Sequence, residues 1–340
     1  MFGDNVNIQK QIVEALMKPE AHKEELQQVE LKQTHISYLF LTKKFVYKVK
    51  KSVNFGFLDF STLEKRRFFC EKELKLNNRL CAEMYIEVVP ITKSEIIRIG
   101  GKGTIIEYAV KMMRIPEEKI MTRLLEEGKI NKKIINQLAK IIFEFHQKTE
   151  TNKRIDEFGS LPMIEKNWKE NFEQTEEFIG TTIPYEIFRL ISESVKEFMN
   201  KKRNLFANRV SENRIRDCHG DIHSGNIFIA DKIYIFDAIE FNERFRYSDI
   251  ASEVAFLAMD LDFNKRTDLS SFFIERYVEY LGDEELERVL NFYKCYRAYV
   301  RGKVISFTLN ALSIGNEEKN RAIKEAKKYF ELAVKYATNL

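Results

Sequence analysis

Residues 218–229 read Cys-His-Gly-Asp-Ile-His-Ser-Gly-Asn-Ile-Phe-Ile, and a second carboxylate, Asp237, ends the apolar run that follows. The pattern predicts an acidic side chain on a loop, Asp221, and an amide five residues later, Asn226. A short apolar hairpin then leads to Asp237. A polar turn between two strands is the simplest alternative, but it does not explain two carboxylates and an amide among such apolar neighbours.

This layout suits phosphoryl transfer, which uses an Asp near the attacking hydroxyl and an Asn and a second Asp to hold metal ions on the nucleotide phosphates. We therefore expect Asp221 to orient the acceptor hydroxyl. Asn226 and Asp237 are expected to coordinate Mg²⁺, a hard ion that prefers oxygen ligands. The spacing of His219, Asp221 and His223 offers an alternative three-ligand site for zinc or iron, against which the downstream Asn226 and Asp237 argue.

The longer string HGDIHSGN, with IFD behind it, resembles the aminoglycoside phosphotransferase-like kinases, which include choline, fructosamine and homoserine kinases. The segments NFGFLDFSTLEKR at 54–66 and IFDAIEFN at 235–242 resemble a bacterial group in which this kinase-like domain precedes a P-loop ATPase domain. The P-loop string Gly-x-x-x-x-Gly-Lys-Ser/Thr does not occur in the sequence. The resemblance implies an α+β, bilobal protein-kinase-like fold that uses ATP and Mg²⁺ to phosphorylate a hydroxyl of a small molecule.

Residues 1–115 are expected to form a β-rich N-lobe that begins with a short amphipathic helix. Alternation along the strand predicted at 45–50 places Lys48 and Lys50 on one face. The resemblance implies that one of these lysines reaches the phosphates, and we favour Lys48. Predicted strands cover residues 29–31, 36–42, 45–50, 85–91, 96–99 and 104–112.

A helix is predicted after the capping box Ser-Thr-Leu-Glu at 61–64. Glu73 on this helix is the candidate ion-pair partner that orients the lysine, with Glu71 and Glu64 as competitors. The last predicted strand runs into Pro116, as a hinge between lobes would. Backbone groups from Lys111 to Met113 are expected to bind the adenine edge there.

Residues 116–340 are expected to form a mainly helical C-lobe with the catalytic loop at 219–226 and Asp237. Residues 150–185 are polar and predict irregular structure. In the resembling family an Asp after the metal-binding segment braces the catalytic loop, so Asp249 is expected to be structural. Glu240 and Glu243 are expected nearer the acceptor pocket. Predicted helices lie near 134–146, 185–210, 253–262 and 323–337.

Two signals disagree about the charge of the acceptor. The apolar run near 253–262 ends in acids, which would suit a substrate that carries an amine. Arg297 and Arg301, four residues apart on one helical face, would suit an anionic substrate. The sequence leaves this question open.

The 340-residue chain is 44% hydrophobic and 32% charged, with 56 Lys and Arg against 52 Asp and Glu. This small positive charge gives no argument for nucleic-acid binding. Four scattered cysteines without Cys-x-x-Cys spacing, no membrane-length apolar run and no signal peptide predict a cytoplasmic protein. A protein-directed kinase or nucleotidyltransferase, or a nucleotide-binding regulatory module without turnover, are alternative functions. The choice between ATP and GTP and the oligomeric state stay open.

Overall fold

The computed structural model describes residues 2–22, 28–310 and 315–340 and divides into two compact units. One unit comprises residues up to Ile120 together with Asn226–Glu243, and the other comprises Met121–Gly225 and Arg244–Leu340. Each unit is described by itself. The segment Asn226–Glu243, which we expected in the C-lobe, packs with the N-terminal residues, so the chain crosses from one unit to the other more than once.

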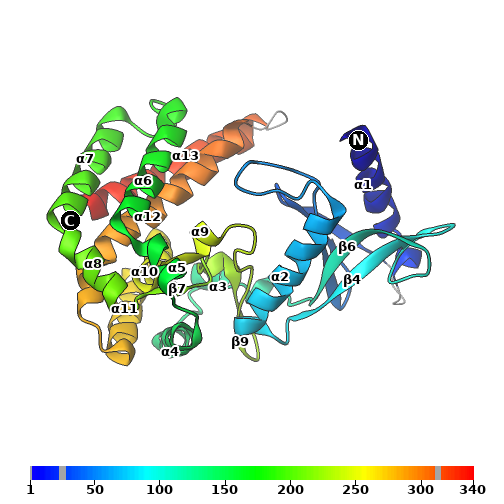
Figure 1. Ribbon diagram of the computed structural model, residues 1–340, viewed down its shortest axis with the longest axis horizontal. Coiled ribbons are helices and arrows are strands. Elements are labelled where there is room, and N and C mark those ends of the chain that lie inside the picture. The colour runs from blue at the N-terminus through cyan, green and yellow to red at the C-terminus, as the bar shows by residue number, and fades with distance from the viewer. Residues whose placement is uncertain (1, 23–27, 311–314) are drawn as a thin grey trace. The chain divides into compact units, whose positions relative to one another are not determined.

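An antiparallel sheet with the strand order β1-β2-β3-β6-β4-β5 forms the centre of the first unit (Figure 1). A separate hairpin pairs β8 with β9. The strands are β1 (Glu30–Gln33), β2 (Ser37–Leu41), β3 (Phe45–Lys50), β4 (Tyr85–Lys93), β5 (Ile97–Ile99), β6 (Thr104–Met113), β8 (Ile227–Ile229) and β9 (Ile233–Ile235). Each strand predicted in the N-lobe has a counterpart within a few residues.

Two helices supply apolar side chains to separate cores of this sheet. Helix α1 (Phe2–Leu16) contributes Ile12 to a core that includes Val49, whereas α2 (Leu63–Cys81) contributes Cys70 to a core that includes Val46. Because side chains alternate along β3, Lys48 lies on the same face as Val46. The polar end of β3 therefore faces α2.

Helix α2 begins at a side-chain cap, with the Thr62 hydroxyl oxygen accepting a hydrogen bond from the Lys65 N–H at 3.3 Å. The helix thus starts one residue later than a cap at Ser61 would place it. An N-cap hydroxyl satisfies one of the amides that the first turn leaves without a partner. Glu73 follows on the buried face of α2 and is fully buried.

The second unit is mainly helical, with one short pair of antiparallel strands, β7 and β10 (Figure 1). Its elements are α3 (Met121–Glu126), α4 (Lys132–Lys148), α5 (Lys153–Asp156), α6 (Leu161–Thr175), α7 (Tyr185–Lys201), α8 (Arg203–Ser211), β7 (Ile215–Asp217), α9 (Glu243–Arg246, whose first residue belongs to the first unit), β10 (Tyr247–Asp249), α10 (Ile250–Phe263), α11 (Thr267–Leu281), α12 (Glu285–Phe307) and α13 (Asn316–Ala337). The α+β class is confirmed.

The prediction of irregular structure for residues 150–185 is wrong, because α5 and α6 lie there. The buried face of α6 carries Ile164, Trp168, Asn171 and Thr175 at helical spacing. Two of these residues are polar, so the stripe gives a weak hydrophobic pattern. The single helix predicted near 185–210 is two helices, with a break at Lys202.

Helix α10 forms the core of the second unit, since its residues from Ile250 to Leu261 are all buried. It packs against α11 and α12. Asp249 caps it by accepting a hydrogen bond from the Ala251 N–H at 2.8 Å. Among the described helices, none combines the length and the apolar character that crossing a bilayer requires.

Candidate active site

Both candidate lysines of β3 bind the same glutamate in the first unit. The Lys48 ammonium lies 2.7 Å from Glu73 Oε1, and the Lys50 ammonium lies 2.6 Å from Glu73 Oε2. Lys48 also lies 2.6 Å from Asp237, and Lys50 also binds Glu240. The structure therefore brings together Lys48 and its predicted partner Glu73, and it adds a contact with Asp237 that was not predicted.

The competitors of Glu73 do not reach these lysines. Glu71 is exposed and binds Arg67 at 2.9 Å, and Glu64 is exposed in the first turn of α2. The runner-up Lys50 is completely buried, and its ammonium also lies 4.8 Å from the centre of the Phe60 ring. A lysine enclosed in this way stabilises the network, while Lys48 remains the better candidate for the phosphates.

The cluster keeps its charges through mutual compensation. Burial alone would lower the pKa of Lys48, but Asp237 and Glu73 raise it well above its usual value. Burial raises the pKa of Glu73, and the two lysines together more than offset that effect and lower it. Burial raises the pKa of Glu240, and the nearby negative charge of Glu73 adds to this effect. Lys50 lowers the pKa but does not offset both.

The hairpin β8–β9 brings the two candidate metal ligands together. Asn226 precedes β8 and Asp237 follows β9, and the Phe236 N–H donates to the Asn226 carbonyl at 3.0 Å. Asp237 has a φ of 65°, which is uncommon for a residue other than glycine, and its side chain is 45% exposed. An exposed carboxylate on an unusual backbone conformation is the kind of feature that marks functional sites.

Asn77 is a residue of this site that the sequence did not reveal. Its side-chain oxygen accepts a hydrogen bond from the Ala238 N–H at 3.0 Å, and its amide nitrogen donates to the Glu73 carbonyl at 2.9 Å. It thereby connects the helix that carries Glu73 to the residue after Asp237. A polar residue one turn after Glu73, on the same helix face, was the available signal.

The predicted hinge residues are engaged within the sheet. Lys111 lies inside β6 between Tyr47 and Glu87, and its ammonium lies 3.2 Å from Glu87. The Met113 N–H donates to the Met84 carbonyl at 2.8 Å. Within the parts of the chain that are described, the Ile115 N–H forms no hydrogen bond, so it is a better candidate donor for a nucleotide base than the Met113 N–H.

Asp221 and the rest of the catalytic loop up to Gly225 belong to the second unit. The Asp221 carboxylate is 33% exposed and lies 3.6 Å from His223 Nε2. Since His223 Nδ1 accepts a hydrogen bond from the Gly225 N–H, the proton of its neutral ring is on Nε2, toward Asp221. Burial raises the pKa of Asp221, but His223 together with Arg301 and His219 brings it to about 2. Asp221 is therefore an anion throughout the physiological range.

Glu253 on α10 fixes the backbone of this loop. Its carboxylate accepts hydrogen bonds from the N–H groups of His219, at 2.9 Å, and Gly220, at 2.6 Å, and lies 2.8 Å from His146 Nε2. Burial raises the pKa of Glu253, but His146, His219 and the Gly220 amide bring it to about 2. Gly220 has a φ of 92°, a conformation that glycine adopts without strain.

Asp249 is structural, but its contacts differ from the brace that the family resemblance implied. Its two oxygens lie 2.9 and 2.7 Å from the guanidinium of Arg209, which also binds Asp283 at 2.6 Å. Glu253, one turn into α10, contacts the backbone of the catalytic loop directly.

The zinc or iron alternative with His219, Asp221 and His223 is wrong. In the described part of the chain, only one group of three His, Cys, Asp or Glu side chains brings a ligand atom from each within 4.8 Å: His146, Cys218 and Glu253. That group needs no metal ion. His146 bonds to Tyr277 and Glu253, and burial raises the pKa of Cys218 well above its usual value, which keeps the thiol protonated.

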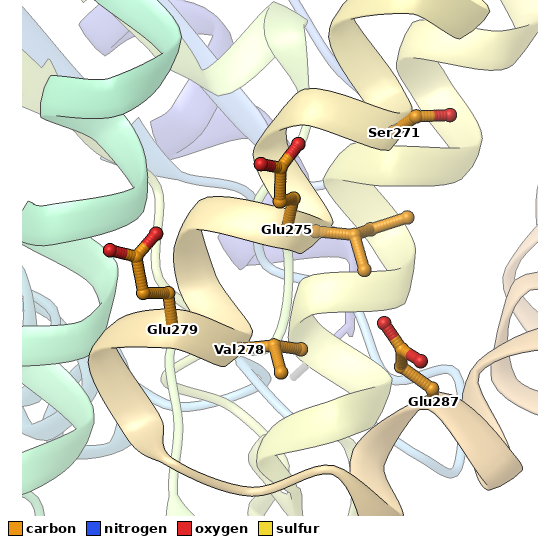
Figure 2. Close-up of a pocket in the computed structure, with 6 residues that line it drawn as sticks. Ser271, Glu275, Val278, Glu279 and Glu287 are labelled. Carbon is orange, nitrogen blue, oxygen red and sulfur yellow. The ribbon is translucent and has the colours of Figure 1, made fainter.

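Glu240 and Glu243, which we expected nearer the acceptor pocket, have partners within the first unit, and their place relative to an acceptor stays a prediction. Glu240 is buried in the first unit and binds Lys50. Glu243 lies 3.8 Å from Lys72 in the same unit. A separate surface pocket in the second unit contains none of the predicted site residues, and its acidic lining is shown in Figure 2. The lining residues are Ser271, Ile274, Glu275, Val278, Glu279 and Glu287.

Relatives in sequence extend over most of the chain. No known protein-family model matches it. Uncharacterized proteins of Mycobacterium bovis and Mycobacterium tuberculosis are 31% identical over 277 residues, which is 81% of this chain and 54% of each relative. The chain thus spans about half the length of the curated relatives that it matches.

Two solved structures resemble the fold along almost the whole chain. Spectinomycin phosphotransferase in complex with ADP and spectinomycin aligns with a TM-score of 0.50 and 15% identity, over 97% of both chains. Amicoumacin kinase in complex with AMP-PNP and Ca²⁺ aligns with a TM-score of 0.56 and 14% identity, over 97% of this chain and 95% of that one. The resemblance predicted from HGDIHSGN is confirmed at the level of the fold: this chain has the kinase-like fold of the aminoglycoside phosphotransferase-like kinases.

Proposed function

We propose that this protein is a Mg²⁺-dependent phosphotransferase that moves the γ-phosphoryl group of ATP to a hydroxyl of a small molecule. The observation that carries the proposal is the contact of Lys48 with both Glu73, at 2.7 Å, and Asp237, at 2.6 Å. A lysine held by a helix glutamate beside a metal-binding aspartate is the phosphate site of kinase-like enzymes.

The residues of the hairpin fit a magnesium ion. Asn226 and Asp237 offer an amide oxygen and a partly exposed carboxylate, and the Phe236–Asn226 hydrogen bond holds the residue before Asp237 against Asn226. Such a ligand set leaves room for phosphate oxygens and water, which Mg²⁺ usually retains. When bound, the ion would neutralise charge on the phosphates.

Asp221 would receive the acceptor hydroxyl. In the transfer, the hydroxyl oxygen bonds to the γ-phosphorus, while the bond from that phosphorus to the bridging oxygen breaks and its electrons stay on ADP. A carboxyl group with a pKa of about 2 is a weak base, so Asp221 would mainly hold and orient the O–H group. The proton then leaves to water late in a largely dissociative reaction.

Nucleotide binding tests the proposal. Thermal unfolding with ATP, GTP and Mg²⁺ is compared for the wild type, Asp237→Ala and Asp231→Ala, since Asp231 is an exposed aspartate in the turn of the same hairpin. We expect a Mg²⁺-dependent rise in Tm that Asp237→Ala abolishes and Asp231→Ala preserves. A wild type that binds neither nucleotide would overturn the proposal.

The role of Asp221 is tested separately. Asp221→Asn is expected to leave the nucleotide-dependent rise in Tm unchanged and to reduce phosphotransfer by several orders of magnitude, because it acts on the acceptor hydroxyl. Equal phosphotransfer by Asp221→Asn and the wild type would exclude this residue from the reaction.

A further inference from the structure

We propose that the acceptor carries an anionic substituent, a carboxylate or a phosphate, which Arg301 binds next to Asp221. This inference rests on the proposed function and names the substrate class of the same site. It concerns residues of the second unit alone: Asp221, α10, α12 and α13.

Helix α12 contacts the catalytic loop at the residue before Asp221. The Arg297 guanidinium donates to the Gly220 carbonyl at 3.1 Å and to the Ser252 carbonyl at 3.2 Å, and it lies 4.8 Å from the centre of the Phe256 ring. Arg297 is 7% exposed. Its Nε and Nη1 atoms are engaged by the protein, and the side chain is buried, so we assign it to positioning the loop.

Arg301 lies one helical turn further along the same face of α12. Its guanidinium is half-buried, 5.6 Å from the centre of the Tyr329 ring, and interacts electrostatically with Asp221 and Asp260. Among the residues that the structure describes, no carboxylate forms an ion pair with it. Arg301 follows, by one helical turn, the arginine that binds the residue before Asp221. One donor interacts with the Tyr329 side chain, and the other N–H groups of the guanidinium are left for a ligand.

The acids that suggested a cationic substrate have protein partners. Asp260 accepts a hydrogen bond from the Ser224 N–H at 2.9 Å. Asp262 lies 2.5 Å from the Lys294 ammonium and accepts a hydrogen bond from the Tyr336 hydroxyl at 2.5 Å. Binding an amine there would require these contacts to be broken. The disagreement between the two sequence signals is therefore resolved in favour of the arginine.

The chemistry of the guanidinium favours an oxyanion. It is planar, always protonated and able to bind a carboxylate or phosphate through two parallel hydrogen bonds. The ring of Tyr329, which is 2% exposed, supports one side of the group. A substrate whose hydroxyl meets Asp221 and whose anionic group meets Arg301 would be fixed at two points, which improves the alignment of the reacting oxygen.

Two sets of alcohols, each similar in size and different in charge, test the inference. The small set is glycerate, glycerol 3-phosphate, glycerol and 3-amino-1,2-propanediol, and the large set is gluconate, sorbitol and glucamine. Acceptor-dependent ADP release is measured with Mg²⁺ and ATP for the wild type, Arg301→Met, Arg301→Lys and Arg288→Met. Arg288→Met removes an exposed arginine from the first turns of the same helix and is the matched control.

We expect only anionic members to stimulate ADP release in the wild type, with glycerol 3-phosphate and glycerate separating phosphate from carboxylate. Arg301→Met should lower kcat/KM for them by roughly 10- to 100-fold, as for the loss of a charge-assisted hydrogen bond. Arg301→Lys should restore part of the loss, and Arg288→Met should equal the wild type. An unchanged nucleotide-dependent rise in Tm in Arg301→Met shows that the variant is folded.

Three results would overturn the inference: a neutral or cationic alcohol as the best acceptor, no stimulation by any anionic member, or equal losses in Arg301→Met and Arg288→Met. Each of them leaves nucleotide binding intact. Failure of the wild type to bind nucleotide is a different result, which refutes the proposed function itself.

Discussion

Glu73 in the first unit and Glu253 in the second are both completely buried carboxylates, but they bind different kinds of groups. Glu73 binds two ammonium groups, those of Lys48 and Lys50. Glu253 binds the backbone amides of His219 and Gly220 and the ring of His146. The first arrangement compensates buried charges, and the second fixes the course of a loop.

The largest effect is expected where a buried carboxylate serves several donors at once. Glu253→Ala leaves the His219 and Gly220 amides and His146 without their acceptor, and should lower the free energy of unfolding by about 4 kcal/mol. Urea denaturation measures this change. The control Glu275→Ala removes an exposed glutamate from α11 and should stay within about 0.5 kcal/mol of the wild type.

In the first unit, substitutions of the two lysines should affect different properties: that of Lys50 mainly the stability, and that of Lys48 mainly nucleotide binding. Lys50→Met removes the cation that pairs with Glu240 and one of the two cations that pair with Glu73. The free energy of unfolding should therefore fall by about 3 kcal/mol. Lys48→Met should cost less stability but abolish the nucleotide-dependent rise in Tm. Urea denaturation and thermal unfolding with Mg²⁺ and ATP measure the two effects.

The reverse pattern, with Lys50→Met abolishing nucleotide binding in a stable protein, would assign the phosphates to Lys50. The double variant Lys50→Met, Glu240→Gln is the control for charge. It should be more stable than Lys50→Met alone, because no charged Glu240 is then left uncompensated.

Acid conditions should reveal the lowered pKa of Asp221. A carboxyl group whose folded-state pKa of about 2 is below its unfolded value stabilises the protein above about pH 4 and loses that contribution as the pH falls toward 2. The stability difference between wild type and Asp221→Asn should be at most about 2 kcal/mol at pH 5 and should shrink at pH 3. A difference that does not change with pH would contradict this.

The smallest effect is expected at the start of the helix that carries Glu73. Thr62→Ala removes the hydroxyl that accepts the Lys65 N–H and should cost about 1 kcal/mol of unfolding free energy. Thr62→Ser keeps the cap and is the control. Nucleotide binding should be unchanged in both variants, because Glu73 lies several turns further on; a loss in Thr62→Ala alone would show that the cap positions Glu73.

The charged cluster of the first unit was accessible from sequence because periodicity gives the faces of its members and the family resemblance implies that a lysine pairs with a helix glutamate. Alternation along β3 puts Lys48 and Lys50 on one face, and Glu73 lies on the buried face of α2. The contact between Lys50 and Glu240 was not predictable, since 190 residues separate the two. Periodicity reports which face a residue occupies, but it does not report which distant segment covers that face.

The residue that holds the catalytic loop was harder to predict from the sequence, for a different physical reason. Glu253 binds backbone amides, and every residue except proline has one, so no partner is visible in the sequence. The family resemblance pointed to Asp249, which caps α10 and binds Arg209 instead. The helical stripe of α6 was missed because Asn171 and Thr175 interrupt its apolar pattern.

The β8–β9 hairpin has a consequence for how this protein can be divided. Residues 226–243 pack with the N-terminal unit but are encoded between two stretches of the other. A gene fragment that stops at residue 120 would therefore produce the sheet and its lysines without Asn226 or Asp237. No single cut separates the units intact, so recombination that exchanges one unit for another would have to splice the chain at several points. Packing thus joins the lysines to the candidate metal ligands, while the gene encodes the hairpin next to the catalytic loop.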